Sequence, residues 1–252
     1  MSTLVSPRVT LAVAARVLAQ LRRDRRTLVM LLALPTLLMS LLWWIYKDSP
    51  GVVFDSIGPS LLALFPFFIL FLVTSVTSVT TLRERSSGTL ERLLSMPMGK
   101  LDFLFGYALA FGLMAAAQSA IAVGVSVVWL GLDVTGPVWL LLLVAVADAV
   151  LGSALGLFVS AFAQTEFQAV QFMPAVVVPQ MLLCGLLVPR DRLPGVLEAI
   201  SDVLPLSYAV DAMQSLVKTA STGEAWADVG VIAGFTAAAL ALGAVTLRRR
   251  TP

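Results

Sequence analysis

The chain has 252 residues, of which 59% are hydrophobic and 13% charged, and its mean hydropathy is +0.94. Soluble globular chains carry roughly a quarter charged residues, so this class is excluded, whereas the net charge of +2 decides nothing by itself. The chain has no histidine and one cysteine, Cys184, which excludes histidine-based catalysis, an internal disulfide and a multi-cysteine metal site. The composition predicts an all-α polytopic membrane protein.

Residues 1–27 predict an amphipathic helix lying in the cytoplasmic membrane interface. Ser6 and Pro7 are typical of a helix start. A helical wheel separates a basic arc of Arg8, Arg16, Arg22 and Arg23 from an apolar arc of Leu11, Ala14, Val17, Leu18 and Leu21. An ordinary helix packed on a soluble domain is the alternative, but the chain offers no such domain. The stretch is too long and amphipathic for a cleavable signal peptide.

Six apolar stretches within residues 28–247 reach the length needed to cross hydrocarbon. The predicted spans are 28–46, 59–82, 103–130, 137–163, 168–188 and 226–247. Trp43 and Trp44 at the end of the first predict an aromatic belt. Thr74, Ser75, Thr77 and Ser78 form a ladder in the second that suits hydrogen bonds between helices.

Residues 83–102 form the one long polar interruption in the first two thirds of the chain. Leu90, Leu93 and Leu94 fall on one helical face, while Glu91 and Arg92 point elsewhere. Gly88 is a plausible N-cap, and Pro97 and Gly99 end the helix. A short amphipathic helix held between two spans is shaped to dock onto a cytoplasmic partner.

The basic residues predict the orientation. With the N-terminus inside, thirteen of the seventeen Lys and Arg residues fall in cytoplasmic segments, including the tail 248–252. Both termini are therefore expected in the cytoplasm. The last outer segment, 189–225, carries an apolar stripe between Pro194 and Pro205. It predicts one or two short helices that lie on the outer leaflet or dip into it.

The segment 83–97 resembles the first cytoplasmic loop of ABC type-2 transporter permeases. The residues that carry this resemblance are Arg83, Glu84, Arg85, Gly88, Thr89, Leu90, Glu91, Arg92, Leu93, Leu94 and Pro97. In that family the loop holds the coupling helix that contacts a separate nucleotide-binding subunit. Glu166, in the other inner loop, is assigned to the same contact.

A second match, Gly185 to Pro189 followed by residues 204–211, is similar to the outer region of drug-exporter members. Gln214 departs from the pattern, because such members often carry arginine near this point. The resemblance implies a permease half that pairs with a second copy or another permease in the bacterial inner membrane. It implies no cofactor on this chain, ATP and Mg²⁺ on the partner ATPase, and no nucleic-acid partner.

The chain lacks the Gly-x-x-x-x-Gly-Lys-Ser/Thr loop that binds ATP phosphates, because its one Gly-Lys pair, Gly99-Lys100, has no glycine five residues earlier. The energy must therefore come from another subunit. A secondary transporter or channel is the alternative, and it usually needs several charges within the membrane. An intramembrane enzyme is a third reading, but no carboxylate cluster, Ser–His pair or metal-ligand set is assembled.

Asp148 is the one acidic residue clearly in mid-span, and with Gln118 it is the candidate pathway site. It must face water, be neutral, or hydrogen-bond to Gln118 or to the ladder that begins at Thr74. A structural hydrogen bond and a place in the substrate pathway both remain open. Spans rich in Phe, Leu, Met, Ser and Thr suit a hydrophobic or amphipathic substrate, a drug or a lipid.

Overall fold

The computed structural model describes residues 6–47, 54–84, 100–160, 162–163 and 165–246. These residues form nine α-helices, one 3₁₀ turn and no β-strand, which confirms the all-helical prediction. The long helices are α1 (Pro7–Arg23), α2 (Arg25–Tyr46), α3 (Phe54–Glu84), α5 (Lys100–Val128), α6 (Val138–Ser160), α7 (Glu166–Leu183) and α10 (Gly223–Thr246). The outer segment adds η2 (Arg190–Arg192), α8 (Gly195–Asp202) and α9 (Pro205–Lys218).

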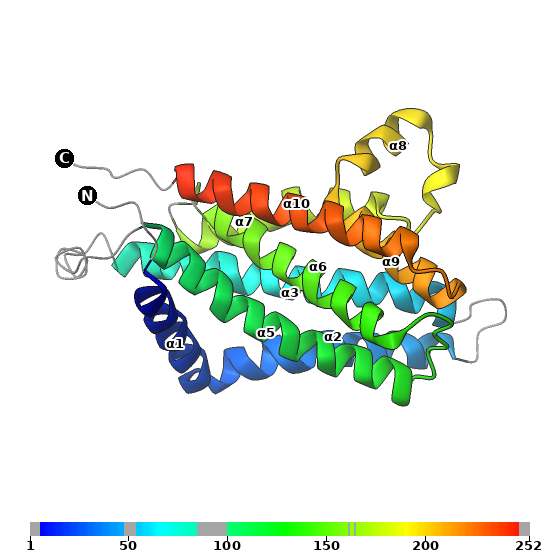
Figure 1. The fold of residues 1–252 in the computed structure, drawn as a ribbon, viewed down its shortest axis with the longest axis horizontal. Coiled ribbons are helices and arrows are strands. Elements are labelled where there is room, and N and C mark those ends of the chain that lie inside the picture. The colour runs from blue at the N-terminus through cyan, green and yellow to red at the C-terminus, as the bar shows by residue number, and fades with distance from the viewer. Residues whose placement is uncertain (1–5, 48–53, 85–99, 161, 164, 247–252) are drawn as a thin grey trace.

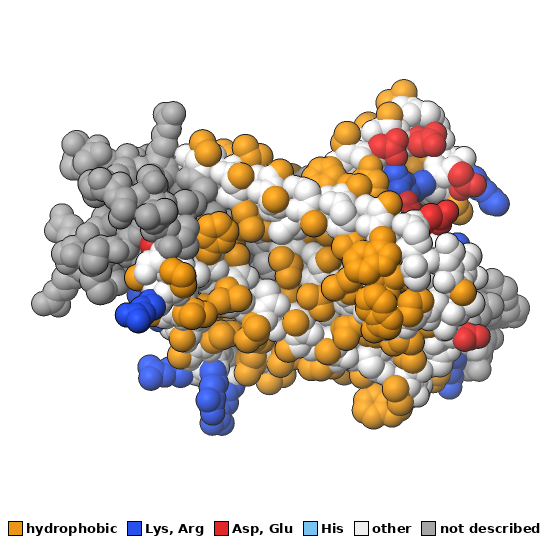
Figure 2. Space-filling view, in the orientation of Figure 1, with side chains coloured by type: hydrophobic (Ala, Val, Ile, Leu, Met, Phe, Trp, Pro, Cys, Tyr) orange, Lys and Arg blue, Asp and Glu red, His pale blue; other side chains and the backbone are white. Residues whose placement is uncertain are grey.

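The long helices other than α1 run along one common axis (Figure 1). Within the described residues, α2, α3, α5, α6 and α10 are long and apolar enough to cross a membrane, while α7 has a shorter apolar stretch, Val170–Leu183. Six spans therefore stay a prediction. The bundle is a multi-pass membrane architecture, because its apolar side chains face outward along the helices (Figure 2).

Helices α3 and α6 form the centre of the bundle, since most of their side chains are buried, whereas α2 and α10 expose most of theirs. A Cβ atom at Gly152 in α6 would lie 2.5 Å from the backbone oxygen of Phe67 in α3. The two backbones can approach this closely only because position 152 has no side chain. Ser119 on α5 donates a 3.0 Å hydrogen bond to the carbonyl of Ala145 on α6.

The two ends of the bundle differ in chemistry. Exposed tryptophans gather at one end, near the end of α2, the end of α5 and the starts of α6 and α10; they are Trp44, Trp129, Trp139 and Trp226. Lys47 lies 5.7 Å from the ring centroid of Trp44. The arginines of α1 and α2 lie at the opposite end. Tryptophan favours membrane interfaces, so this belt marks one boundary of the hydrocarbon layer.

Helix α1 crosses the basic end at an angle to the bundle axis (Figure 1). Its buried residues are Val13, Ala14, Val17 and Leu21. The predicted apolar arc was thus right for three of these four, but Leu11 is 58% exposed and Val13 takes its place. The reason lies in α5, where Gly106 leaves room for Val13: a Cβ at position 106 would be only 2.6 Å from it.

Several helix ends differ from the predicted spans because of glycine. The fifth span was predicted to reach Val188, but α7 ends at Leu183, and Gly185 follows with φ of +89°. The third was predicted to reach Leu130, but α5 ends at Val128, shortly before Gly131 with φ of +73°. These left-handed conformations favour glycine and turn the chain away from the helix axis.

The outer segment divides into two parts. Helix α9 packs inside the bundle against α3, α6 and α10, with Leu206, Val210 and Met213 fully buried. It is therefore not a surface helix. Helix α8 stands away from the bundle (Figure 1), and Val196 on it and Val203 directly after it are exposed. The stripe predicted between Pro194 and Pro205 is thus apolar, and most of it is left exposed by the described residues.

Candidate functional site

The predicted docking segment begins where α3 ends. Arg83 and Glu84 are the last two residues of α3, and α5 starts at Lys100. The remaining predicted contacts lie outside the described residues: Arg85, Gly88, Thr89, Leu90, Glu91, Arg92, Leu93, Leu94 and Pro97. The short amphipathic helix therefore stays a prediction.

Glu166 is the first residue of α7, and the side chain of Thr165 caps this helix by accepting a 3.0 Å hydrogen bond from the backbone N–H of Gln168. The end of α3 and the starts of α5 and α7 lie at the same end of the bundle, together with the start of α1 and the end of α10 (Figure 1). The topology thus brings Glu166 to the end of the molecule from which the docking segment leaves.

Asp102 fixes α1 to this end of the bundle. Its carboxylate, 3% exposed, accepts a 2.6 Å hydrogen bond from the backbone N–H of Ser6 and a 3.2 Å bond from the hydroxyl of Thr10. A side chain from the first turn of α5 therefore satisfies an unpaired donor at the start of α1. The contact between Ser6 and Asp102 could not be predicted from the sequence, because the two residues are 96 positions apart and no local pattern connects them.

The two candidate pathway residues are buried in the same core. Asp148 and Gln118 are both fully buried, and neither side chain has a hydrogen-bond partner among the described residues. Ser119 of α5 is hydrogen-bonded to Ala145 of α6, and these two neighbouring helices run antiparallel. At a rise of about 1.5 Å per residue, Gln118 and Asp148 therefore differ by only about 3 Å in their position along the bundle axis. The structure brings the two to one level without joining them.

Thr74, the first residue of the hydroxyl ladder, does not reach Asp148. Phe67 of α3 lies opposite Gly152 of α6. Thr74 is two helical turns beyond Phe67 along α3, whereas Asp148 is one turn before Gly152 along α6, in the opposite direction along the bundle axis. The two side chains are therefore about 16 Å apart in height. Thr74 is itself buried without a hydrogen-bond partner. Thr74 is thus not a hydrogen-bond partner of Asp148, and the other residues of the ladder, Ser75, Thr77 and Ser78, stay a prediction because their side chains are not described.

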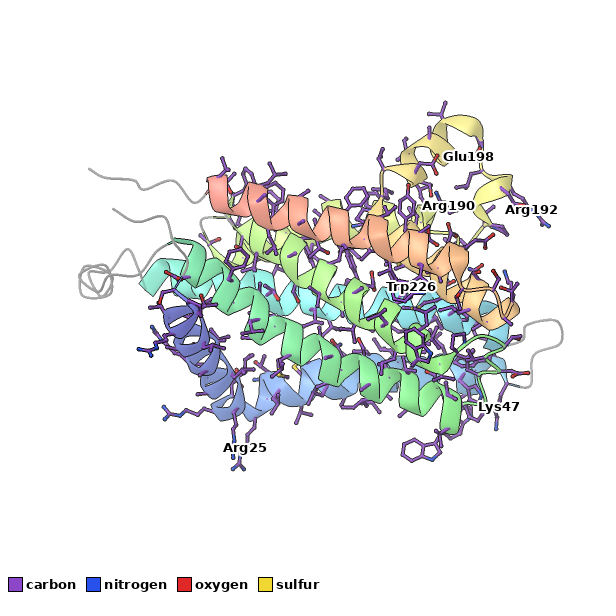
Figure 3. The ribbon with its side chains drawn as sticks, viewed as in Figure 1. Arg25, Lys47, Arg190, Arg192, Glu198 and Trp226 are labelled. Atoms are coloured by element: carbon purple, nitrogen blue, oxygen red, sulfur yellow. The ribbon has the colours of Figure 1, made fainter. Side chains whose placement is uncertain are left out.

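An ion-pair cluster that the sequence analysis did not single out holds α8 to α9. The guanidinium of Arg190 donates to the carboxylates of Asp202 and Asp211 and lies 5.4 Å from the ring centroid of Tyr208 (Figure 3). Burial lowers the pKa of Arg190, but the two carboxylates outweigh it and the net shift is upward. Burial raises the pKa of Asp211 although Arg190 opposes this shift.

Gln214, the residue that departs from the drug-exporter pattern, also has a structural role. Its side-chain amide donates a 3.0 Å hydrogen bond to the hydroxyl of Ser60, and Lys218 donates to its oxygen at 3.1 Å. Gln214 therefore joins α9 to the outer half of α3.

Comparison with known families decides the relationship. The family described as ABC-2 type transporter matches residues 8–217, which include α1, the predicted docking segment, Glu166 and the pathway candidates. The chain belongs to the ABC-2 type transporter family. The resemblance read from residues 83–97 is confirmed at the level of the family.

Individual relatives of this ABC-2 family chain are distant. It is 25% identical over 69% of its length to "ABC transporter G family member 20" of Dictyostelium discoideum, covering 23% of that protein. It is 27% identical over 53% of its length to "Probable multidrug ABC transporter permease YbhS" of Escherichia coli, covering 36%. Nodulation protein J of Rhizobium meliloti is 24% identical over 67% of the chain and 64% of that protein. The chain thus spans about a quarter to a third of the first two relatives.

We expect the Asp148 variants to separate stability from transport. Asp148→Leu removes a buried polar group that has no partner in the described residues, so the melting temperature in detergent should stay equal or rise. Asp148→Asn should likewise fold, since its size is unchanged. If the carboxyl serves transport, both variants export less of a cationic compound than the wild type.

Matched amounts of protein in the membrane control for expression. Normal export by Asp148→Asn, together with a loss of roughly 1–3 kcal/mol of stability in Asp148→Leu, would show that the side chain is a structural hydrogen-bonding group instead.

Proposed function

We propose that this chain is the permease subunit of an ATP-driven exporter that moves hydrophobic or amphipathic compounds, drugs or lipids, out of a bacterial cell. The family match over residues 8–217 carries the proposal. Two of the Escherichia coli relatives, YbhS and YbhR, are named "Probable multidrug ABC transporter permease", and these names favour this substrate class. The broad apolar surface and the absence of histidine from the sequence are compatible with transport without chemistry on this chain.

A separate ATPase is the proposed source of energy. The sequence carries no phosphate-binding loop of the P-loop type, so ATP and Mg²⁺ would be held by the partner. The partner would contact the segment 83–97 and Glu166, which leave the bundle at one end. A second permease, identical or related, would complete the pathway in the bacterial inner membrane.

Everted membrane vesicles test the source of energy. We expect the uptake of a fluorescent cationic amphiphile to require ATP and to continue when an ionophore collapses the ion gradients. A secondary transporter would behave in the opposite way, because its transport depends on such a gradient. Uptake that the ionophore stops and ATP cannot restore would therefore reject the proposal in favour of that alternative.

A further inference from the structure

The elbow between α1 and α2 concentrates positive charge. Arg22, Arg23, Arg25 and Arg26 surround a single acidic residue, Asp24, and all four arginines are exposed. Asp24 ends α1 and caps α2, where its two carboxylate oxygens accept from the backbone N–H of Thr27 at 3.1 Å and from its hydroxyl at 2.6 Å. These bonds lower the pKa of Asp24, so the carboxylate is ionised and engaged with Thr27.

Three of the arginines share one hollow. Ala19, Arg22, Arg23 and Arg25 line an open concavity of about 500 Å³. None of these three arginines forms an ion pair with any residue that the structure describes. Exposed guanidinium groups that line an open space, with no carboxylate ion-pair partner among the described residues, fit a phosphate, to which arginine donates two parallel hydrogen bonds.

Apolar surface begins next to the hollow. One turn beyond Arg25 and Arg26, Val29 and Met30 are 61% and 52% exposed. Met30 starts an exposed stripe on α2 that continues at helical spacing through Leu37 and Leu41 to Trp44. Figure 3 shows Arg25 at the elbow, pointing away from the bundle, with α2 leading off along the bundle axis. A soluble phosphate would make no use of this stripe, whereas the acyl chain of a lipid would.

We propose that the α1–α2 elbow is a binding site for one anionic phospholipid of the leaflet at the basic end. Its phosphate sits among Arg22, Arg23 and Arg25, and an acyl chain follows the exposed stripe of α2. This is a discrete site at the elbow, distinct from the general attraction of a basic helix to a charged surface. It does not depend on the ATPase or on the substrate that is transported.

Lipid titration of the purified full-length chain, followed by native mass spectrometry, tests the site. We expect one phosphatidylglycerol molecule to bind more tightly than phosphatidylcholine, and glycerol phosphate not to displace it. The double variant Arg23→Gln, Arg25→Gln should weaken binding roughly thirtyfold, at about fivefold for each arginine near a membrane surface. Arg23→Lys, Arg25→Lys should bind with intermediate strength, because lysine keeps the charge but loses the paired hydrogen bonds.

The matched control is Arg8→Gln, Arg16→Gln, which removes the same charge from the exposed face of α1 outside the hollow. It should weaken binding less than about threefold. Equal weakening in the two double variants would overturn the proposal and show diffuse attraction. Equal affinity for phosphatidylcholine would overturn it as well, and displacement by glycerol phosphate would reassign the hollow to soluble phosphates. If the Arg23→Gln, Arg25→Gln variant does not fold, the Arg23→Lys, Arg25→Lys variant takes its place. It should bind phosphatidylglycerol more weakly than the Arg8→Gln, Arg16→Gln control does, and equal or tighter binding would overturn the proposal.

Discussion

A double variant carrying Leu93→Asp and Leu94→Asp is expected to lose ATP-driven transport while its bundle stays folded. Both leucines fall on the apolar face of the helix predicted in the docking segment. A charge placed without a partner in the core of an interface typically costs about 2–5 kcal/mol. The ATPase should therefore dissociate or become uncoupled, which copurification and transport in vesicles measure together. Glu91→Lys, which reverses a charge at the polar edge, should act in the same direction.

Ser86→Asp, Ser87→Asp is the matched control, because it adds the same two charges to polar positions of the same segment. Its transport should stay close to that of the wild type. Wild-type transport by the leucine double variant would remove the docking role from this face, and equal loss in both variants would show that the segment responds to charge alone.

Gly152→Val should give the largest loss of stability that the described structure indicates. The new Cβ would lie 2.5 Å from the backbone oxygen of Phe67, and a backbone atom cannot move aside as a side chain can. Overpacking typically costs about 1–3 kcal/mol, and contact with backbone places this site at the upper end. The melting temperature in detergent should fall by more than about 5 °C.

Gly124→Val provides the comparison. Gly124 lies in α5, where an added Cβ would meet nothing within 4 Å, so the intrinsic effect of replacing glycine by valine in a helix is the same at both positions. Its melting temperature should stay near that of the wild type. A similar drop in both variants would mean that the α3–α6 contact is not the cause.

Five of the six predicted spans coincide with described helices that are long and apolar enough to cross a membrane. They could be predicted because crossing hydrocarbon needs a run of apolar residues, which is a local property of the sequence. Which face of each helix is buried was harder to predict, because this depends on the residues of the helix that packs against it. Leu11 is as apolar as Val13, yet Val13 is buried because Gly106 lies opposite. Helix α9 belongs to the segment that was predicted to lie on the outer leaflet or dip into it, yet it packs within the bundle, where the amide of Gln214 donates a hydrogen bond to Ser60 of α3.

In the candidate site, too, features carried by neighbouring residues could be predicted, whereas contacts between residues far apart in the sequence could not. The pattern of residues 83–97 is contiguous, so the family could be recognised from it, and the match over residues 8–217 agrees. The surroundings of Asp148 depend on the helices that pack against α6, so the sequence could list possible partners of Asp148 but not choose among them. The ties from Asp102 to Ser6 and from Arg190 to Asp202 and Asp211 depend on the fold in the same way.

The dependence on a separate ATPase is tested most directly by ATP hydrolysis in proteoliposomes. The chain reconstituted alone should hydrolyse no ATP. Addition of its ATPase partner should give hydrolysis that the transported compound stimulates and that Leu93→Asp, Leu94→Asp abolishes. Turnover of ATP by the purified chain without any partner would contradict the account.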